Sequence, residues 1–184
     1  MRWARASLIL WLVMANGWRC AAQHVPAVAG GQATRTADAS VATAVVGPTG
    51  GAVALSGGAK VVVPAGVLQV PTLISIREVP LPPTVQIPPG TARVGKFYSI
   101  EPRLTVSQPI AVTLPYDPTL LPPGFEEGSV SIYQLRANGR LSMVGSVTAD
   151  PTSESAGQDL DIINNVVTVR VRSTATYTLL AIGN

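Results

Sequence analysis

VVTVRVR, residues 166–172, is the most regular pattern in the sequence. Its second, fourth and sixth residues are valines, whereas Thr168, Arg170 and Arg172 are the polar residues that alternate with them. Successive side chains of a β-strand point to opposite faces, so the valines share one face and the polar residues the other. The run therefore predicts a strand with one buried face and one solvated face.

Other segments repeat this two-residue period. Ile110, Val112 and Leu114 share one face of a run that Pro109 and Pro115 are expected to bound at its two ends, since proline cannot donate to a strand ladder. Further strands are predicted at residues 52–55, 59–63, 73–78, 96–101 and 177–182.

The clearest hairpin signal is VSIYQLRANGRLSMVGSV, residues 130–147. Asn138 and Gly139 tolerate the positive φ that tight turns require. Apart from the N-terminal leader no segment has a helical stripe, and 17 glycines and 16 prolines separate the short strands. The sequence therefore predicts an all-β fold with essentially no helix, either an antiparallel β-sandwich or a partly open barrel, and we favour the sandwich.

The first 22 residues have the order of a signal peptide. Arg2 and Arg5 give a positive start, Ala6 to Ala15 form an apolar run of ten residues, and small residues follow. Such a run is too short to span a bilayer, and a cut after Ala22 fits the small-x-small rule. We therefore predict a signal peptide over 1–22 and an exported protein, secreted or held in the periplasm or cell envelope. No transmembrane helix is expected after the leader, because no later segment approaches about eighteen unbroken apolar residues.

Cys20 offers a different processing route, which is lipid attachment. The bulky Trp18 and charged Arg19 before it are unlike the small residues that such processing prefers, so free secretion is favoured over a lipid anchor at Cys20. Cys20 is also the only cysteine, so the mature chain is expected to form no internal disulfide.

The net charge changes when the leader is set aside. The whole sequence has 13 basic and 10 acidic residues and a formal charge of +3. Arg2, Arg5 and Arg19 lie in the leader, so the mature chain has 13 − 3 = 10 basic residues against 10 acidic ones. A neutral chain lacks the basic footprint of nucleic-acid binding, and no nucleic-acid partner is expected.

Residues 23–44 contain no aromatic side chain, no Leu and no Ile. This composition predicts a flexible linker with a mean reach of about 26 Å. The folded domain is then expected over residues 45–184, which is long enough to bury a core.

The inventory of catalytic groups is small. His24 is the only histidine, and it lies in the predicted linker, so a Ser-His-Asp or Cys-His arrangement and a histidine-rich metal site are excluded. Gly50-Gly51 and Gly57-Gly58 lack the Lys-Ser/Thr context of a phosphate loop and are predicted to form turns. We therefore expect neither an enzyme nor a cofactor.

Oxygen ligands for a hard cation such as calcium gather at residues 150–161, where the candidates are Asp150, Glu154, Asp159 and Asp161. The spacing differs from that of a standard calcium loop, so a solvated connection is the favoured interpretation. Glu126 and Glu127 could suggest a hydrolase, but neighbouring residues of an extended segment point to opposite sides.

Four arginines are the candidates for contact with a partner. Arg170 and Arg172 share the polar face of one predicted strand, and Arg136 and Arg140 flank the predicted hairpin turn. Guanidinium groups bind carboxylates and anionic glycans well. The alternative interpretation is a solvated face.

Two blocks, GGAVALSGGAKVVVPAGVLQVPTLISI (50–76) and YSIEPRLTVSQPIAVTLPYD (98–117), together with the closing run 167–182, resemble the ZU-five domain. This β module is named from zonula occludens proteins and netrin receptors and also occurs in ankyrins. The residues that match are Gly50, Gly51, Pro64, Gly66, Val67, Leu68, Pro102, Leu104, Val106, Ser107, Pro109, Ile110, Val112 and Leu114.

The resemblance covers roughly residues 47–182 and implies a β-sandwich with a non-catalytic interaction role, here in a secreted single-domain protein that we expect to be bacterial. Some animal members cleave themselves at a His-Phe-Ser turn. The nearest equivalents here, Arg172-Ser173 and Ala175-Thr176, lack that histidine, so self-cleavage is not expected.

The sequence leaves two classes of function open. The favoured hypothesis is a secreted or periplasmic interaction module that binds a protein or a surface polymer through loops or a strand edge. The alternative is a carboxylate-dependent glycan hydrolase or a glycan-binding domain. A hydrolase would need a cleft on which Asp or Glu side chains converge.

Overall fold

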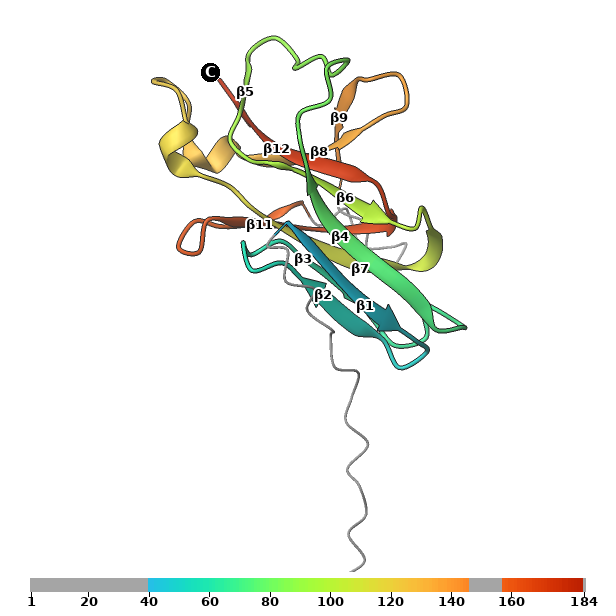
Figure 1. Cartoon of the computed structure of the whole chain (residues 1–184). Helices are drawn as coiled ribbons and strands as arrows, with labels where there is room; N and C mark the ends of the chain where they lie inside the picture. The colour runs from blue at the N-terminus through green and yellow to red at the C-terminus, as the bar shows by residue number, and fades with distance from the viewer. Residues whose placement is uncertain (1–39, 146–156, 184) are drawn as a thin grey trace, which may run out of the picture.

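The computed structural model describes residues 40–145 and 157–183, which form two packed antiparallel sheets (Figure 1). The predicted all-β sandwich is confirmed. The predicted signal peptide, Cys20, His24, Asp150 and Glu154 lie outside the described residues. No helix in the described ranges has the length and apolar character needed to cross a membrane.

The first sheet has seven strands, paired in the order β1, β4, β6, β12, β8, β9, with β5 also paired to β12. Their bounds are β1 Val41–Val46, β4 Thr72–Val79, β5 Thr91–Arg93, β6 Phe97–Glu101, β8 Ser131–Leu135, β9 Leu141–Met143 and β12 Thr176–Ile182.

The second sheet has five strands in the order β10, β11, β7, β3, β2. Their bounds are β2 Gly51–Ala54, β3 Lys60–Val63, β7 Thr105–Pro115, β10 Asp159–Asp161 and β11 Val166–Ser173. Two 3-10 turns, η1 Pro118–Leu120 and η2 Glu127–Ser129, follow β7 and are the helical segments of the described residues.

The alternation predicted for residues 166–172 is confirmed in β11. Val167, Val169 and Val171 are buried, whereas Arg170 and Arg172 are exposed. The buried valines stand opposite the apolar residues of β7, since β11 and β7 pair in register over residues 166–171 and 110–115. These two strands therefore supply the inner face of the five-stranded sheet.

The expectation that Pro109 bounds its strand is wrong, because Pro109 lies inside β7. The ladder with β11 passes from the pair Val171 and Ile110 to the pair Ser173 and Thr105, so three extra residues bulge from β7. A bulged position has no ladder hydrogen bond to lose, which is why proline is tolerated there.

The domain begins earlier than residue 45. Val41–Val46 pair antiparallel with β4, so residues 41–44 belong to β1 and not to the linker. Ala42 and Ala44 pack against the core, and Val46 is buried. Alanine gives only a weak two-residue period because its side chain is small and apolar, which explains why the sequence pattern missed this strand.

The predicted hairpin at residues 130–147 is confirmed by the pairing of β8 with β9. Gly139 has a φ of +76°, its N–H donates to the carbonyl of Arg136 at 3.0 Å, and the Arg140 N–H donates to Asn138 Oδ1 at 3.1 Å. Asn138 and Gly139 therefore form the tight turn that the sequence predicts.

A second apolar cluster covers the outer face of the seven-stranded sheet. Phe97, Tyr133, Leu141 and Leu180 are buried in it, and partly buried residues that include Val85 pack against them. Val85 belongs to the connection between β4 and β5, which folds back over this face. The central strands are thus buried on both sides.

Thr178 carries an unusual buried hydroxyl. It is fully buried on β12, and its Oγ1 has no hydrogen-bond partner among the described residues. Valine has the same shape without the hydroxyl, so Thr178→Val is expected to raise the free energy of unfolding by about 1–2 kcal/mol in urea denaturation. Thr176→Val is the matched control, because Thr176 Oγ1 accepts from Arg103 Nη2 at 2.9 Å, and it is expected to lower stability. A loss of stability in Thr178→Val would contradict the conclusion that the Thr178 hydroxyl is buried without a hydrogen-bond partner.

Candidate functional site

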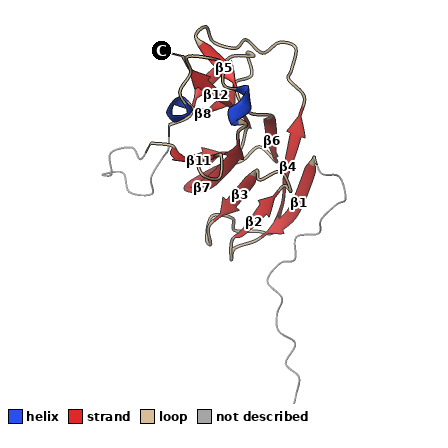
Figure 2. Cartoon of the chain, turned by 90° about the vertical axis from the view of Figure 1, so that its left-hand side faces the viewer, coloured by secondary structure: helices blue, strands red, loops and turns tan. Residues whose placement is uncertain are grey.

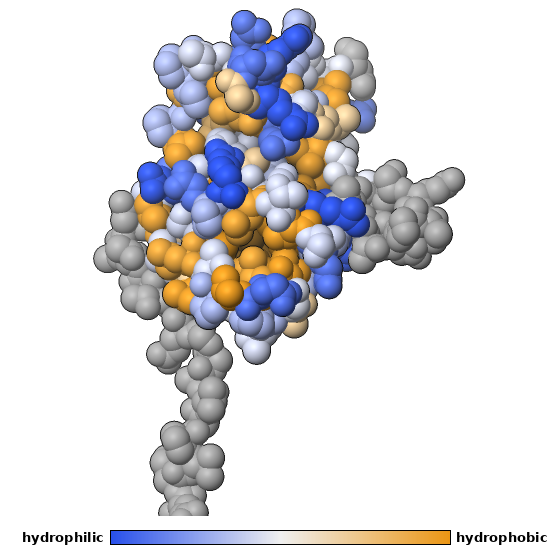
Figure 3. Space-filling view, turned by 90° about the vertical axis from the view of Figure 1, so that its right-hand side faces the viewer, coloured by the Kyte–Doolittle hydropathy of each residue, from blue (hydrophilic) through white to orange (hydrophobic). Residues whose placement is uncertain are grey.

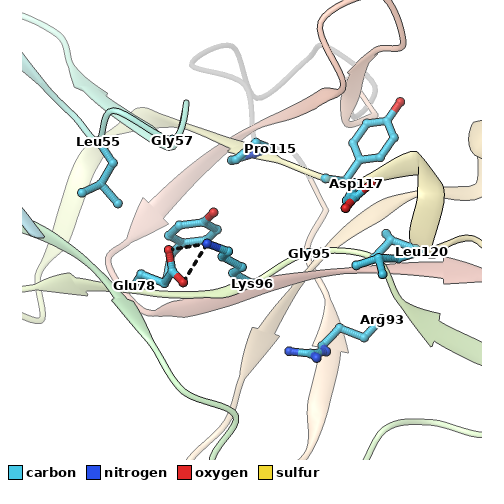
Figure 4. A pocket seen from close by; sticks show the side chains of 12 residues that line it. Leu55, Gly57, Glu78, Arg93, Gly95, Lys96, Pro115, Asp117 and Leu120 are labelled. Atoms are coloured by element: carbon cyan, nitrogen blue, oxygen red, sulfur yellow. Dashed lines mark hydrogen bonds and ion pairs between the residues drawn. The ribbon is translucent and has the colours of Figure 1, made fainter. Parts of the chain in front are cut away.

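A cleft of about 510 Å³ opens at the end of the sandwich that holds the β2–β3 turn (Figure 2 faces this end). It lies between the tip of that turn, the end of β4, the β5–β6 connection and the segment from Pro115 to Leu120. Figure 4 shows Leu55 and Leu120 on opposite sides of the cleft, with the side chains of Glu78 and Lys96 between them.

The β5–β6 connection forms one wall because it is held between the two sheets. Val94 donates its N–H to the carbonyl of Leu179 on β12, and the Asp117 N–H donates to the carbonyl of Val94. Gly95 also forms a bridge with Tyr116. A Cβ at Gly95 would lie 2.7 Å from Leu179 Cδ1, so this close approach requires glycine.

The strand register explains why charged groups line the cleft. Glu78 and Tyr98 are paired between β4 and β6, so their side chains share the inner face of the sheet. Farther along β4 the same face presents Ile74 and Ile76, which are buried in the core. The inward positions thus change from apolar to charged where the core ends.

Glu78 and Lys96 form an ion pair at the centre of the cleft. Lys96 Nζ lies 2.9 Å from each of the two carboxylate oxygens of Glu78. The Lys96 side chain is 64% exposed, so water screens the pair and its contribution to stability is at most about 1 kcal/mol. Its main effect is to place a positive charge beside the Glu78 carboxylate.

Asp117 is engaged with its own turn. Its Oδ1 accepts from Thr119 Oγ1 at 2.6 Å and from the Thr119 N–H at 2.9 Å, which caps η1. These hydrogen bonds hold the pKa of the Asp117 carboxyl below its usual range. Asp117 is therefore ionised at neutral pH.

Tyr98 and Arg93 offer groups that no described residue binds. Tyr98 is buried, and burial together with the charge of Glu78 raises its pKa to about 12, so its hydroxyl stays a neutral donor. That hydroxyl has no hydrogen bond to a described residue, and solvent reaches it from the cleft. Arg93 is exposed on the cleft wall, and its guanidinium forms no ion pair within the described ranges.

The two carboxylates that line the cleft, those of Glu78 and Asp117, do not have the properties of a glycosidase pair. Such an enzyme needs a carboxylic acid whose pKa is raised, so that it can protonate the leaving group. Asp117 has a lowered pKa, and Glu78 is held by Lys96. The cleft instead combines apolar walls with a cation and a hydroxyl that bind no described residue, which is typical of a binding site.

The four arginines predicted for partner contact do not form one group. Arg170 and Arg172 lie on β11 of the five-stranded sheet, whereas Arg136 and Arg140 flank the β8–β9 turn of the seven-stranded sheet. Arg136 Nε donates to Ser142 Oγ at 2.7 Å. None of the four lines the cleft.

Asp159 and Asp161 lie on β10, an edge strand, and not on a continuous acidic loop. Asp161 accepts from the N–H groups of Ile163 and Asn164, each at 3.1 Å, and so fixes the turn into β11. Within residues 40–145 and 157–183, no three His, Cys, Asp or Glu side chains come together as metal ligands.

Glu126 and Glu127 have different surroundings. Glu126 is exposed at the start of η2, whereas a carboxylate oxygen of Glu127 accepts from the hydroxyl of Tyr116. They therefore do not act as a pair.

Sequence reasoning did not find Arg93, Lys96 or Glu78 as site residues, because they are far apart in the chain and each resembles a surface residue. A signal was present in the alternate residues Ile74, Ile76 and Glu78. A strand whose inward face ends on a charge marks the edge of the core.

No known protein-family model matches this chain, and no curated protein matches it in sequence. The resemblance to ZU-five domains stays a prediction. Its two blocks fall on the strands β2 to β4 and on β6 and β7.

Proposed function

We propose that this chain is an exported, non-catalytic β-sandwich module that binds a protein partner in the cleft between the β2–β3 turn and η1. The observation that carries the proposal is a pair of groups that no described residue binds, the Arg93 guanidinium and the Tyr98 hydroxyl, beside the apolar side chains of Leu55 and Leu120. This combination suits a peptide segment that presents an apolar side chain next to a carboxylate.

Exposed apolar tips beside the cleft support a protein as the ligand. Leu120 is 51% exposed, Ile162 56% and Ile163 88%. The turn that carries the two isoleucines lies next to the cleft, because the Tyr116 N–H donates to the carbonyl of Asn165 at 2.9 Å. Loop tips of this kind commonly form the contact surface of binding modules.

The first test is a titration followed by nitrogen-edited NMR, with N-acetylleucine as the probe and N-acetylleucinamide as its uncharged counterpart. We expect the acid to shift the amide signals of Arg93, Gly95 and Lys96. It should bind about tenfold more tightly than the amide, because only the acid can pair with a guanidinium.

Arg93→Gln should remove the preference for the acid, since glutamine keeps polarity but not charge. Arg77→Gln is the matched control, as Arg77 is exposed on β4 and lies outside the cleft. Equal binding of acid and amide by the unaltered protein, or shifts confined to other parts of the sandwich, would overturn the proposal.

A further inference from the structure

A second hollow, of about 470 Å³, lies at the opposite end of the seven-stranded sheet from the cleft. It is formed by the β6–β7, β8–β9 and β11–β12 turns, which lie on the right-hand side of Figure 1. Figure 3 faces this side of the molecule and shows a band of hydrophilic residues above an apolar area. We call this hollow the arginine groove, after Arg103 and Arg136 in its lining.

Both guanidinium groups of the groove are positioned by neutral side chains. Arg103 Nη2 donates to Thr176 Oγ1 at 2.9 Å, and Arg136 Nε donates to Ser142 Oγ at 2.7 Å. Each guanidinium has five N–H donors, so four remain on each for a ligand. Neither forms an ion pair within the described residues.

The two positive charges act on the same place. Tyr177 is buried beneath this end of the sheet, and burial raises its pKa to about 12, while the charges of Arg103 and Arg136 oppose that rise. Both guanidinium groups also belong to the lining of the same hollow, although they are 33 residues apart in the sequence. The fold therefore concentrates positive charge here.

Negative charge is kept to the edge of this region. The described residues that line the groove include no Asp or Glu. The nearest carboxylate in the hydrogen-bond network is Glu101, which accepts from Ser99 Oγ at 3.4 Å, and Ser99 Oγ in turn lies 3.4 Å from Thr176 Oγ1. A chain of hydrogen bonds through these two hydroxyl groups connects Glu101 to Arg103.

The rest of the lining favours a ligand rich in hydroxyl groups. Thr84 and Gln134 contribute a hydroxyl and an amide group, which can both donate and accept hydrogen bonds. The buried hydroxyls of Thr174 and Thr176 are already hydrogen-bonded within the protein. Leu135 and Ala137 add apolar surface to the lining. A sugar ring matches this mixture, because its hydroxyls can bind the polar groups while its C–H face lies on the apolar ones.

We propose that the arginine groove is a binding site for an acidic sugar, with the carboxylate of a uronic acid held by Arg103 and Arg136 and the sugar hydroxyls bound by Thr84 and Gln134. This site is separate from the protein-binding cleft. A chain with both sites can hold an acidic polysaccharide at one end and a protein at the other.

The test is an NMR titration of the protein with sodium glucuronate, with glucose as the uncharged sugar and sodium acetate as the carboxylate without hydroxyls. We expect glucuronate to shift the side-chain N–H signals of Arg103 and Arg136 and to bind at least about tenfold more tightly than either control. Oligomers of glucuronate should bind at the same residues.

Arg103→Gln and Arg136→Gln should each weaken glucuronate binding about tenfold or more, whereas Arg140→Gln, on the same hairpin but outside the groove, should leave it unchanged. Circular dichroism of each variant checks that the fold is kept. Equal binding of glucose and glucuronate, equal binding of acetate, or undiminished binding by a folded Arg103→Gln variant would overturn the proposal. None of these outcomes affects the cleft, whose test uses Arg93.

Discussion

Gly50→Ala is expected to lower the free energy of unfolding by about 3–5 kcal/mol, measured by urea denaturation. Gly50 closes the turn between β1 and β2, where its N–H donates to the carbonyl of Gly47 at 3.0 Å. Its φ is +76°, which costs an alanine about 1–2 kcal/mol. In addition, a Cβ there would lie 2.6 Å from the carbonyl oxygen of Val63 and 2.7 Å from the nitrogen of Ala65. Backbone atoms cannot rotate aside, so the β3 end of the sheet must shift.

Two other glycines separate the cost of the positive φ from the cost of the contact between an added Cβ and the backbone. Gly66 has a φ of +81°, but nothing lies within 4 Å of the position that an alanine methyl group would take there, so Gly66→Ala is expected to cost only about 1 kcal/mol. Gly57 has neither constraint, and Gly57→Ala should change stability by less than about 0.5 kcal/mol. If Gly50→Ala lowered the free energy of unfolding no more than Gly66→Ala, this result would contradict the close packing of the β1–β2 turn against the end of β3.

Leu180→Ala is expected to lower the free energy of unfolding by about 2–4 kcal/mol, because it leaves a cavity in the second apolar cluster. Leu180 is fully buried, although it lies on the face of the sheet that points away from the other sheet. Leu179, its neighbour on the inner face, is equally buried, and Leu179→Ala should have a similar cost.

Leu73→Ala provides the comparison for an uncovered part of the same outer face. Leu73 is 59% exposed on β4, so its removal should cost less than about 0.5 kcal/mol. Leu180→Ala behaving like Leu73→Ala would show that the β4–β5 connection does not cover β12.

The strands could be predicted because their signal is local. The valines of 166–172 and the Asn138-Gly139 turn need only their neighbours in sequence to indicate a strand and a hairpin. The double burial of β12 also left a trace, since Leu179-Leu180-Ala181 is a continuous apolar run, as expected of a strand covered on both faces. The connection that covers it carries no comparable pattern.

The cleft and the arginine groove could not be predicted, because strand pairing over long separations builds them. Arg136 was a candidate from the sequence, but its neighbour in the groove is Arg103, which follows β6, and not Arg170 or Arg172. In the cleft, Arg93 and Glu78 come together only because β4, β5 and β6 meet at one end of the sheet. Side-chain type alone does not distinguish such residues from solvated ones.

The most direct test of the proposed function is a crystal structure of the protein with N-acetylleucine. We predict that the ligand lies in the cleft, with its carboxylate hydrogen-bonded to Arg93 and the Tyr98 hydroxyl and its side chain packed against Leu55 or Leu120. A ligand bound elsewhere on the sandwich, or a cleft ligand whose carboxylate does not contact Arg93, would contradict it.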